Sequence, residues 1–549
     1  MRLFPPVLVA FLLSFPLAAN DSVYRRLQSG SSTGPASIHA RGIFGQGQTI
    51  AVLDTGLDYD NCYFAESDGS PPPTNTVLAD GTLEASNVDP SRRKVIAYNF
   101  LYSCTENGGA AGCDDPADPR AWDNQGHGTH AAAVAAGDKG ARLVHDPADS
   151  IAPGAKLVIQ DAGYIGGDNC SQRPGLGCPL RDLRPVLAQA YAQGARIHTN
   201  SWGDRQGIPP PFTPPTANYS QAAAEIDAFV FENPDMLVVF NSGNAGQLGS
   251  RSASAPGVAK NAIQVGGVVL FEGEEAIAAF SGRGPTQDGR LKPDLVAPAV
   301  ITAGDSDFDV TTGACNVSRQ TGTSWSAPAV AGAAALVREY FEAGFYPAGI
   351  EDPRRATNPS AALVKAMLIA SASPVRWDSA GGRLVETESV PSSAQGFGVP
   401  VLDDALFFQG EEGRLIVRDV RSVSGLQEGD RSLIRINVSP GIPLKVVLVW
   451  TDPPSSARGG NDETAVLTND LDLVVTRPGS VSLLGNDFGV TGRADRLNNV
   501  ELVSVESPEA GMWTIAVDAG KIAAGPKQGF SLVITGGVTE VSRTRPARR

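Results

Sequence analysis

The sequence predicts an α/β domain built on a doubly wound, mostly parallel sheet, followed by a smaller all-β domain. With 549 residues the chain is too long for one ordinary hydrophobic core, so two domains are expected. Between about residues 38 and 406, short apolar runs alternate with helical stretches of small residues, as in parallel sheets. Beyond residue 410 the runs are short, rich in β-forming residues and separated by Gly, Pro, Asn and Asp.

The elements of the first domain follow from this alternation. Apolar runs predict strands, and the small-residue stretches between them predict helices. The predicted strands include residues 49–53, 156–159, 236–240 and 262–265, and the predicted helices include residues 183–195, 221–232, 327–342 and 361–373.

The second domain is predicted to be a β-sandwich or jelly roll, because no helical period is evident in it. Its predicted strands are residues 415–417, 432–438, 444–450, 471–476, 500–505, 513–517 and 530–534. The domain boundaries are accordingly placed at residues 37–406 and 407–540.

The N-terminal residues have the features of a secretory signal. Arg2 precedes an apolar run over residues 4–17 that ends in small residues, so residues 1–19 are predicted to be a signal peptide of a secreted protein. That run is too short to span a bilayer, and no later run of about 18 apolar residues occurs, so no membrane span is expected. Residues 20–36 are polar and rich in Gly and Ser and are predicted to be a tail. The basic residues 541–549 are predicted to be disordered.

The net charge of −15 and the pI of about 4.9 exclude one class of partner. An acidic surface repels phosphate backbones and anionic membranes, so no nucleic acid is expected as a partner. Most of this charge is ascribed to solubility.

The six cysteines predict disulfides and not a metal site. None of them has the spacing to histidine that zinc sites use, and an oxidising destination favours disulfides. Two local pairs can close short loops, but the sequence leaves the connectivity, and a free cysteine, open. The local pairs are Cys104–Cys113 and Cys170–Cys178, and the remaining cysteines are Cys62 and Cys315.

Asp54 ends the first apolar run and is followed by Thr55 and Gly56. In an open parallel sheet the carboxyl ends of the strands form the ligand crevice, so Asp54 is a candidate site residue. Taken alone, an Asp at this place more often forms a turn.

Two of the five histidines lie in the segment Gly126-His127-Gly128-Thr129-His130. The small residues that follow predict a tightly packed helix with the His127 imidazole near its N-terminus. The glycines beside His127 allow a close approach of another backbone, which favours a functional role. His130 is predicted to be structural.

Ser324 follows Gly322 and Thr323 and precedes a run rich in alanine. Pro328 fits only in the first helical turn, so Ser324 is predicted to start a helix, where free N–H groups favour negative charge. A helix cap is the ordinary alternative. The Gly-x-Ser-x-Gly pattern of α/β-hydrolase esterases is absent around this serine.

Together these segments supply the parts of a nucleophilic serine site. Serine reacts only when a base removes its proton, and the base needs a carboxylate to hold its tautomer. Ser324, His127 and Asp54 meet these requirements, and Asn244, which follows the run at residues 236–240, can donate to an oxyanion.

The blocks that contain Asp54, His127 and Ser324 resemble the three active-site motifs of the subtilases, the subtilisin-like serine peptidases. The resemblance implies a subtilisin-like fold and a serine endopeptidase that acts through an acyl-enzyme on protein or peptide substrates. The three residues would then form the catalytic triad.

Other segments extend this resemblance. The block from Asn241 to Asn244 resembles the oxyanion segment of the family and implies Asn244 as the donor. The segments near residues 449–453, 469–473 and 498–501 resemble the C-terminal β-barrel (jelly roll) of the oxidatively stable alkaline subtilases. The substrate-binding residues implied are Ser201, Trp202, Gly203, Ser242 and Gly243.

Two departures from the family pattern bear on the function. Trp325 stands where the family commonly has Met, whose oxidation would crowd the site, so the enzyme is expected to tolerate peroxide. Residues 20–36 are much shorter than the usual folding segment of family proenzymes, which leaves the activation route open.

No cofactor is required for this chemistry, and a monomer is expected. Structural calcium is considered because acidic and amide side chains, which are hard oxygen ligands, are frequent in the second domain. Asp470 and Asp472 are the calcium candidates, and solvated loops are the alternative. The acidic and amide side chains of the second domain that suggest such a site are Asp452, Asp462, Glu463, Asn469, Asp470, Asp472, Asp487 and Asp495.

Two other functional classes stay open from the sequence. The same triad would serve a serine esterase or a peptide ligase. A non-catalytic binding protein would use the second domain and keep the first as a scaffold.

Overall fold

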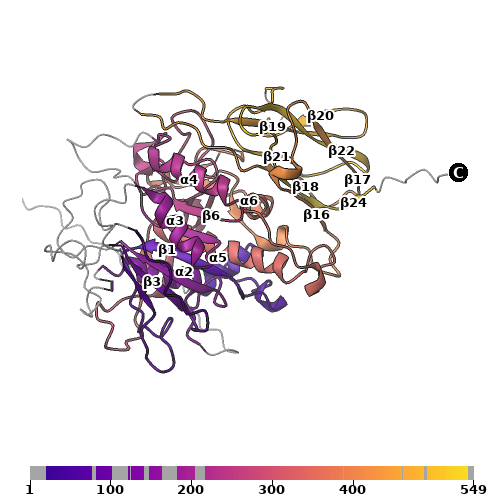
Figure 1. Cartoon of the computed structure of the whole chain (residues 1–549). Helices are drawn as coiled ribbons and strands as arrows, with labels where there is room; N and C mark the ends of the chain where they lie inside the picture. Colours follow the sequence, from indigo (N-terminus) through magenta and orange to yellow (C-terminus); the bar gives the residue numbers. More distant parts are fainter. Residues whose placement is uncertain are drawn as a thin grey trace, which may run out of the picture.

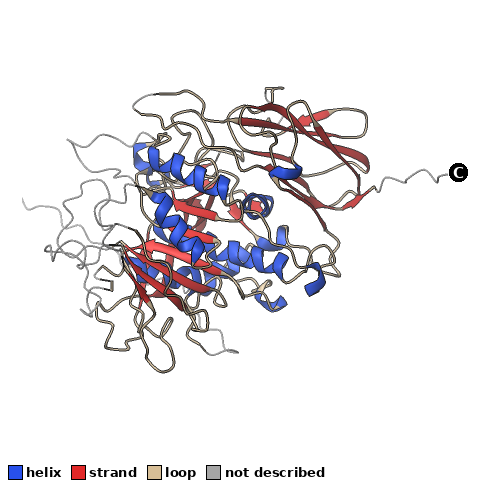
Figure 2. Ribbon diagram, in the orientation of Figure 1, coloured by secondary structure: helices blue, strands red, loops and turns tan. Residues whose placement is uncertain are grey.

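The computed structural model describes residues 20–76, 82–101, 122–123, 125–140, 148–162, 182–203, 217–387, 389–459, 462–487 and 491–541. These residues form an α/β domain and a β-sandwich that lies against it (Figure 1). Figure 2 shows that the long helices gather in the first domain, whereas the second consists mainly of strands and loops. The predicted signal peptide and both predicted local cysteine pairs lie outside the described residues.

One large sheet organises the first domain, and its strands follow the order β14-β13-β8-β7-β6-β5-β1-β4-β3-β2, with β9 beside β7. Pairing is parallel from β2 to β7 and between β7 and β9, whereas β7 and β8 are antiparallel. The predicted doubly wound, mostly parallel sheet is therefore confirmed. The strands are β1 (Thr49–Asp54), β2 (Thr74–Asn75), β3 (Val95–Phe100), β4 (Lys156–Asp161), β5 (Ile197–Asn200), β6 (Leu237–Asn241), β7 (Ile263–Phe271), β8 (Glu274–Ile277), β9 (Leu295–Pro298), β13 (Trp377–Asp378) and β14 (Val385–Glu386).

Two pairs of helices cover this sheet. Helices α3 and α4 pack on each other and on β4 and β6, whereas α2 and α5 pack on each other and on β1. Two small sheets, β10-β11 and β12-β15, complete the domain. The helices are α1 (Asn20–Ser29), α2 (His127–Ala136), α3 (Leu183–Ala192), α4 (Gln221–Glu232), α5 (Thr323–Glu342) and α6 (Ala361–Ala370). The small strands are β10 (Val300–Gly304), β11 (Val317–Thr321), β12 (Ala372–Ser373) and β15 (Val399–Pro400).

Short 3₁₀ helices connect several of these elements. They are η1 (His39–Arg41), η2 (Gly246–Leu248), η3 (Pro353–Arg355), η4 (Ala380–Gly382), η5 (Leu402–Asp404) and η6 (Ser422–Ser424).

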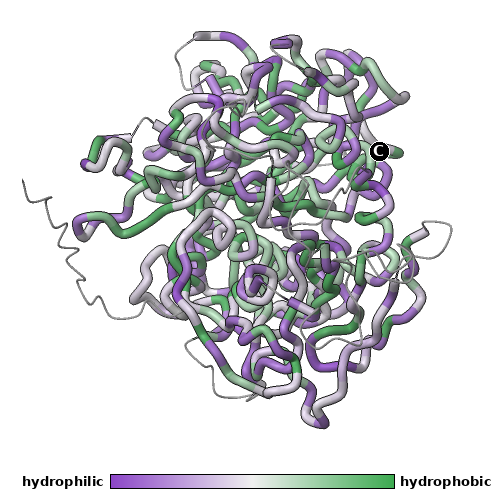
Figure 3. Tube along the Cα trace, turned by 90° about the vertical axis from the view of Figure 1, so that its left-hand side faces the viewer, coloured by the Kyte–Doolittle hydropathy of each residue, from purple (hydrophilic) through white to green (hydrophobic). Residues whose placement is uncertain are grey.

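The second domain is a sandwich of two sheets, with the strand orders β16-β23-β18-β21 and β20-β19-β22-β17-β24. Its interior is a separate apolar cluster around Trp450 and Trp513. Figure 3 shows hydrophobic stretches of the chain running through the molecule. The predicted sandwich is thus present, and the jelly-roll topology stays a prediction. The strands are β16 (Arg414–Val420), β17 (Arg431–Val438), β18 (Leu444–Val449), β19 (Asn469–Thr476), β20 (Ser482–Leu484), β21 (Val500–Val505), β22 (Gly511–Ile522), β23 (Phe530–Gly536) and β24 (Val538–Glu540).

The predicted tail at residues 20–36 differs from the structure, because helix α1 occupies its first part. Val23, Tyr24 and Leu27 are buried and belong to the core of the first domain. Their spacing puts three apolar side chains on one helical face, a short pattern that the surrounding polar residues mask. Residues 20–29 are therefore a packed part of the first domain and not a free tail, whereas residues 30–33 are exposed.

The two cysteines left over in the sequence form a disulfide, Cys62–Cys315. It links the loop after β1 to the segment before β11. The bridge joins two segments that lie 253 residues apart in the sequence.

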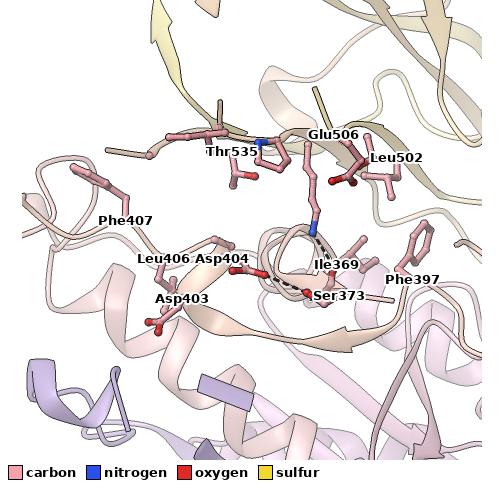
Figure 4. A pocket seen from close by; sticks show the side chains of 18 of the residues that line it. Ile369, Ser373, Phe397, Asp403, Asp404, Leu406, Phe407, Leu502, Glu506 and Thr535 are labelled. Carbon is pink, nitrogen blue, oxygen red and sulfur yellow. Dashed lines mark hydrogen bonds between the residues drawn. The ribbon is translucent and has the colours of Figure 1, made fainter. Parts of the chain in front are cut away.

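The two domains meet along helix α6, which packs on α5 and on β18 and β23. A cavity of about 560 Å³ lies at this junction, and Figure 4 shows Ser373 and Asp404 of the first domain facing Leu502 and Glu506 of the second. Ser373 Oγ donates to Asp404 Oδ2 at 3.2 Å within it. None of the predicted site residues lines this cavity.

Candidate active site

Asp54 lies at the carboxyl end of β1, between β4 and β5. After β1 the chain crosses to the edge strands β2 and β3 and returns through β4, and it then continues from β5 to β7 on the other side of β1, so the connections change direction at this point. Such a switch point is where open α/β sheets hold their ligands. The Asp54 carboxylate is buried, and its Oδ1 accepts the N–H of Thr55 at 2.8 Å.

His127 is the first residue of α2 and hydrogen-bonds Asp54, with 2.6 Å between Nδ1 and Oδ1. Glycine makes this approach of α2 to β1 possible, because a Cβ on Gly128 would lie 2.1 Å from Gly56 O. Since a carboxylate only accepts, Nδ1 carries the proton and Nε2 is left as the basic nitrogen. The His127 side chain is 32% exposed, whereas that of Asp54 is 2% exposed.

The charge of Asp54 sets the protonation of this imidazole. Burial lowers the pKa of His127, but the neighbouring Asp54 carboxylate outweighs it, so the pKa is raised above its usual value. Burial, aided by the charge of His127, lowers the pKa of His130 to about 3. His130 therefore stays neutral, and its edge packs on Trp325, as expected of a structural residue.

Ser324 is the second residue of α5, as the sequence predicts, and its neighbour Trp325 packs on His127 with ring centroids 4.8 Å apart. Pro328 lies in the second turn, not the predicted first. Because proline has no N–H, it cannot donate to Ser324 O, four residues earlier. Ser201 Oγ donates to that carbonyl instead, at 2.6 Å. In return, Ser324 Oγ donates to Ser201 O at 3.3 Å, which joins the end of β5 to the start of α5.

Asn244 follows β6 and reaches the same helix start. Its Oδ1 accepts both the N–H and the hydroxyl of Thr323, each at 2.9 Å. Because that N–H can only donate, the amide atom that faces it is Oδ1, and Nδ2 is left as a donor. Asn244 is exposed, and it lies beside the first turn of α5.

Comparison with known proteins decides the family. The family model described as "Subtilase family" matches residues 45–398, which include Asp54, His127 and Ser324. The chain belongs to the subtilase family. Membership supports a serine protease in general.

Among the relatives of this subtilase is the "Serine protease/ABC transporter B family protein tagD" of Dictyostelium discoideum. It is 25% identical over 90% of this chain and 32% of its own length. The chain thus spans about a third of the length of such relatives. "Serine protease AprX" of Bacillus subtilis is 33% identical over 114 residues, which are 19% of this chain and 26% of AprX. The crystal structure of a serine protease of Aeromonas sobria has 15% identity and a TM-score of 0.42 over 94% of both chains.

The residues implied for substrate binding lie on the segments after β5 and β6. Trp202 is buried against Phe240, with ring centroids 5.1 Å apart. Gly203 packs closely on Ser254, since a Cβ there would lie 2.5 Å from Ser254 Oγ. Together with Ser201, these residues form a segment at the carboxyl edge of the sheet beside Ser324.

The segment after β6 is held on both sides. The N–H of Ser242 donates to Val265 O at 2.8 Å. Gly243 has a φ of 83°, a conformation that favours glycine, and its carbonyl accepts the N–H of Gly282 at 3.0 Å. These bonds fix the position from which Asn244 reaches α5.

Asp470 and Asp472, the calcium candidates, both contact Arg496. Nη1 of Arg496 donates to Asp472 Oδ1 and Oδ2 at 2.8 and 2.9 Å and to Asp470 Oδ2 at 2.5 Å. The described residues contain no group of three or more His, Cys, Asp or Glu side chains that could hold a metal. One guanidinium thus pairs with both carboxylates, and calcium here stays a prediction.

The sequence reasoning missed Asp123, a buried carboxylate that contacts Thr55, directly after β1, and Thr129 of α2. No capping pattern marked it, because the N-cap of α2 is Gly126, three residues after Asp123. It also missed the pair Lys260–Asp452, which joins the two domains.

Among the described residues, no helix is long and apolar enough to cross a membrane.

Proposed function

We propose that this subtilase is a secreted serine endopeptidase that hydrolyses peptide bonds of proteins through an acyl-enzyme. The observation that carries the proposal is the 2.6 Å bond between His127 Nδ1 and Asp54 Oδ1, which leaves Nε2 as a base. Ser324 begins the helix that packs on the helix of His127, which supports its role as the nucleophile.

In the proposed reaction, Ser324 Oγ attacks the substrate carbonyl while His127 Nε2 accepts its proton. In the structure Ser324 Oγ donates to Ser201 O, so the attack requires Oγ to turn toward the His127 imidazole. A catalytic hydrogen bond of this kind often forms only when the substrate is bound. Asp54 holds the imidazole and stabilises its cation. His127 then returns the proton to the leaving amine, and a water molecule repeats the cycle to release the acyl group.

Two donors are proposed to stabilise the oxyanion. One is Asn244 Nδ2, whose orientation follows from the bonds of Oδ1 to Thr323. The other is the N–H of Ser324, which lies in the first turn of α5, where N–H groups have no helical acceptor. Both act without any cofactor.

The substrate is proposed to be an extended polypeptide that lies beside the segments after β5 and β6. Secretion rests on the predicted signal at residues 1–19, and a monomer is proposed. An esterase or ligase would use the same triad, so the substrate must be tested separately.

The decisive experiment is labelling with a fluorophosphonate probe, comparing the native chain with Ser324→Ala. We expect labelling of the native protein alone, together with hydrolysis of casein that the variant lacks. Equal labelling of both proteins would remove Ser324 as the nucleophile. Turnover of a short-chain ester without any cleavage of casein would favour the esterase alternative.

A further inference from the structure

The carboxylate of Asp123 lies between the end of β1 and the start of α2. It is 2% exposed, and its two oxygens accept from both elements. Oδ1 accepts the hydroxyl of Thr55 at 3.0 Å and the N–H of Gly126 at 2.9 Å. Oδ2 accepts the N–H and the hydroxyl of Thr129 at 2.9 and 2.6 Å.

The two threonine hydroxyls turn these bonds into a cross-brace. Thr55 Oγ1 donates to Asp123 and accepts the N–H of Gly128 at 2.9 Å, so it connects the β1 end to α2. Thr129 Oγ1 donates to Asp123 and accepts the N–H of Asp58 at 2.8 Å, so it connects α2 back to the β1 loop. Each hydroxyl thus uses its one proton on Asp123 and a lone pair on the opposite element.

The cross-brace acts next to the reacting groups. Thr55 directly follows Asp54, and Gly128 directly follows His127, so one oxygen atom, Thr55 Oγ1, links the neighbours of both. The orientation of His127 toward Asp54 is therefore coupled to the position of Asp123. Catalytic geometry of this kind must be held within about 0.5 Å, and a 1 Å displacement can cost about 100-fold in rate.

We propose that Asp123 is a positioning residue that sets the His127–Asp54 geometry through the hydroxyls of Thr55 and Thr129. Only a carboxylate satisfies this place, because every described partner of its oxygens is a donor. An amide would direct its NH₂ group at one set of donors and break that side of the brace. This inference rests on the proposed peptidase function.

The test compares Asp123→Asn with Asp227→Asn. Asp227 is a matched control, since its carboxylate is wholly buried and also accepts only N–H and O–H donors, from Tyr219, Lys260 and Asn261, away from the site. For Asp123→Asn we expect kcat per fluorophosphonate-titrated site to fall about 100-fold, with KM changed less than about twofold. For Asp227→Asn we expect a lower melting temperature with native kcat per site. A folded Asp123→Asn with native kcat per site would overturn the proposal.

A second pair of variants keeps the test decisive if Asp123→Asn does not fold. Thr55→Val preserves the side-chain shape but removes the hydroxyl, whereas Thr55→Ser keeps it. We expect Thr55→Val to lose about tenfold or more in kcat, in line with a small misplacement of the pair, and Thr55→Ser to recover most of that loss. Equal kcat for the two variants would refute the brace. If the native protein itself neither reacts with the probe nor cleaves casein, the peptidase function fails, which is a different result.

Discussion

Two pairs of side chains bring opposite charges together inside the protein, His127–Asp54 at the active site and Lys260–Asp452 at the domain junction. The two pairs differ in their exposure and in how many of their polar atoms have hydrogen-bond partners. At the active site, His127 is one-third exposed, and Asp54 Oδ2 has no hydrogen-bond partner among the described residues. At the junction, both side chains are fully buried. Lys260 Nζ donates to Asp452 Oδ2, to Pro453 O at 2.6 Å and to Val466 O at 2.9 Å, which uses all three of its protons.

Asp452 is equally well satisfied. Its Oδ1 accepts the N–H of Asn469 at 2.7 Å, and Oδ2 also accepts the N–H of Thr468 at 2.9 Å. A buried ion pair withstands its desolvation only when its remaining donors and acceptors are paired in this way. The junction pair is thus fully hydrogen-bonded and keeps its charges fixed. At the active site, His127 Nε2 stays available, so that its protonation can change.

Breaking the junction pair should give the largest loss of stability. In Lys260→Met the Asp452 charge stays buried without its partner, and we expect the unfolding free energy to fall by about 3–5 kcal/mol. Turnover per titrated site should stay native in the folded fraction, because the pair lies away from Ser324. Urea denaturation followed by fluorescence measures the first quantity, and active-site titration the second.

The matched control for Lys260→Met is Arg184→Met, which removes an exposed ion pair with Glu232. Both side chains there are about half exposed, so we expect a loss below about 1 kcal/mol. Similar urea midpoints for the two variants would contradict the view that the junction pair holds the domains together.

Removing the oxyanion donor should give the opposite result, a loss of rate with little loss of stability. We expect Asn244→Ala to lower kcat by about 10²–10³. Asn244→Asp sharpens this test, because it keeps an oxygen for the Thr323 donors but replaces the Nδ2 donor by an acceptor. Stopped assays on a peptide substrate measure kcat, and native turnover in Asn244→Asp would rule out Asn244 as a donor.

The same contrast explains what the sequence could predict. The strand at Thr49–Asp54 and the helices after His127 and around Ser324 have local signals, namely apolar runs, alanine-rich stretches and flanking glycines. A predicted strand also places its last residue, since parallel strands end at a common edge of the sheet. The positions of Asp54, His127 and Ser324 therefore followed from local patterns and the family resemblance.

Contacts between distant segments had no such signal. Lys260 and Asp452 lie 192 residues apart, and nothing near either residue marks it as buried. Helix α1 has only three apolar residues on one face, too short a pattern to stand out in a polar segment. The sequence predicted Pro328 only in the first turn of the helix. Its place in the second turn depends on Ser201 Oγ, which donates to Ser324 O in place of the missing proline N–H and comes from a distant strand end.

The pH dependence should separate the reacting histidine from the buried ones. His127 must be neutral to accept a proton, so kcat/KM should rise about tenfold per pH unit on the acid side. Since the Asp54 charge raises the pKa of His127, the midpoint should lie above 6.5. Initial rates from pH 4 to 9 measure it, and a midpoint below 6.5 would contradict the assigned pair.

The pH dependence of stability should come from a different histidine, the buried His198. Burial lowers the pKa of His198 to about 3, and its ring is satisfied as a neutral group by Gln160 and Asn200. The unfolded state takes up a proton near pH 6.5 and the folded state does not, so stability should decline as pH falls from 6.5 toward 3. His198→Gln should flatten this decline in urea midpoints while leaving the pH profile of kcat/KM unchanged.

The smallest effect is expected from removing calcium. Arg496 already pairs with both Asp470 and Asp472, so we expect EDTA to change the melting temperature of the native protein by less than about 1 °C. In Arg496→Gln the two carboxylates lose that partner and repel each other, and added Ca²⁺ should then raise the melting temperature by a few degrees. A drop of several degrees in the native protein with EDTA would instead place a cation among these residues, and the second domain would then contain a site that, like the active site, keeps ligand atoms open.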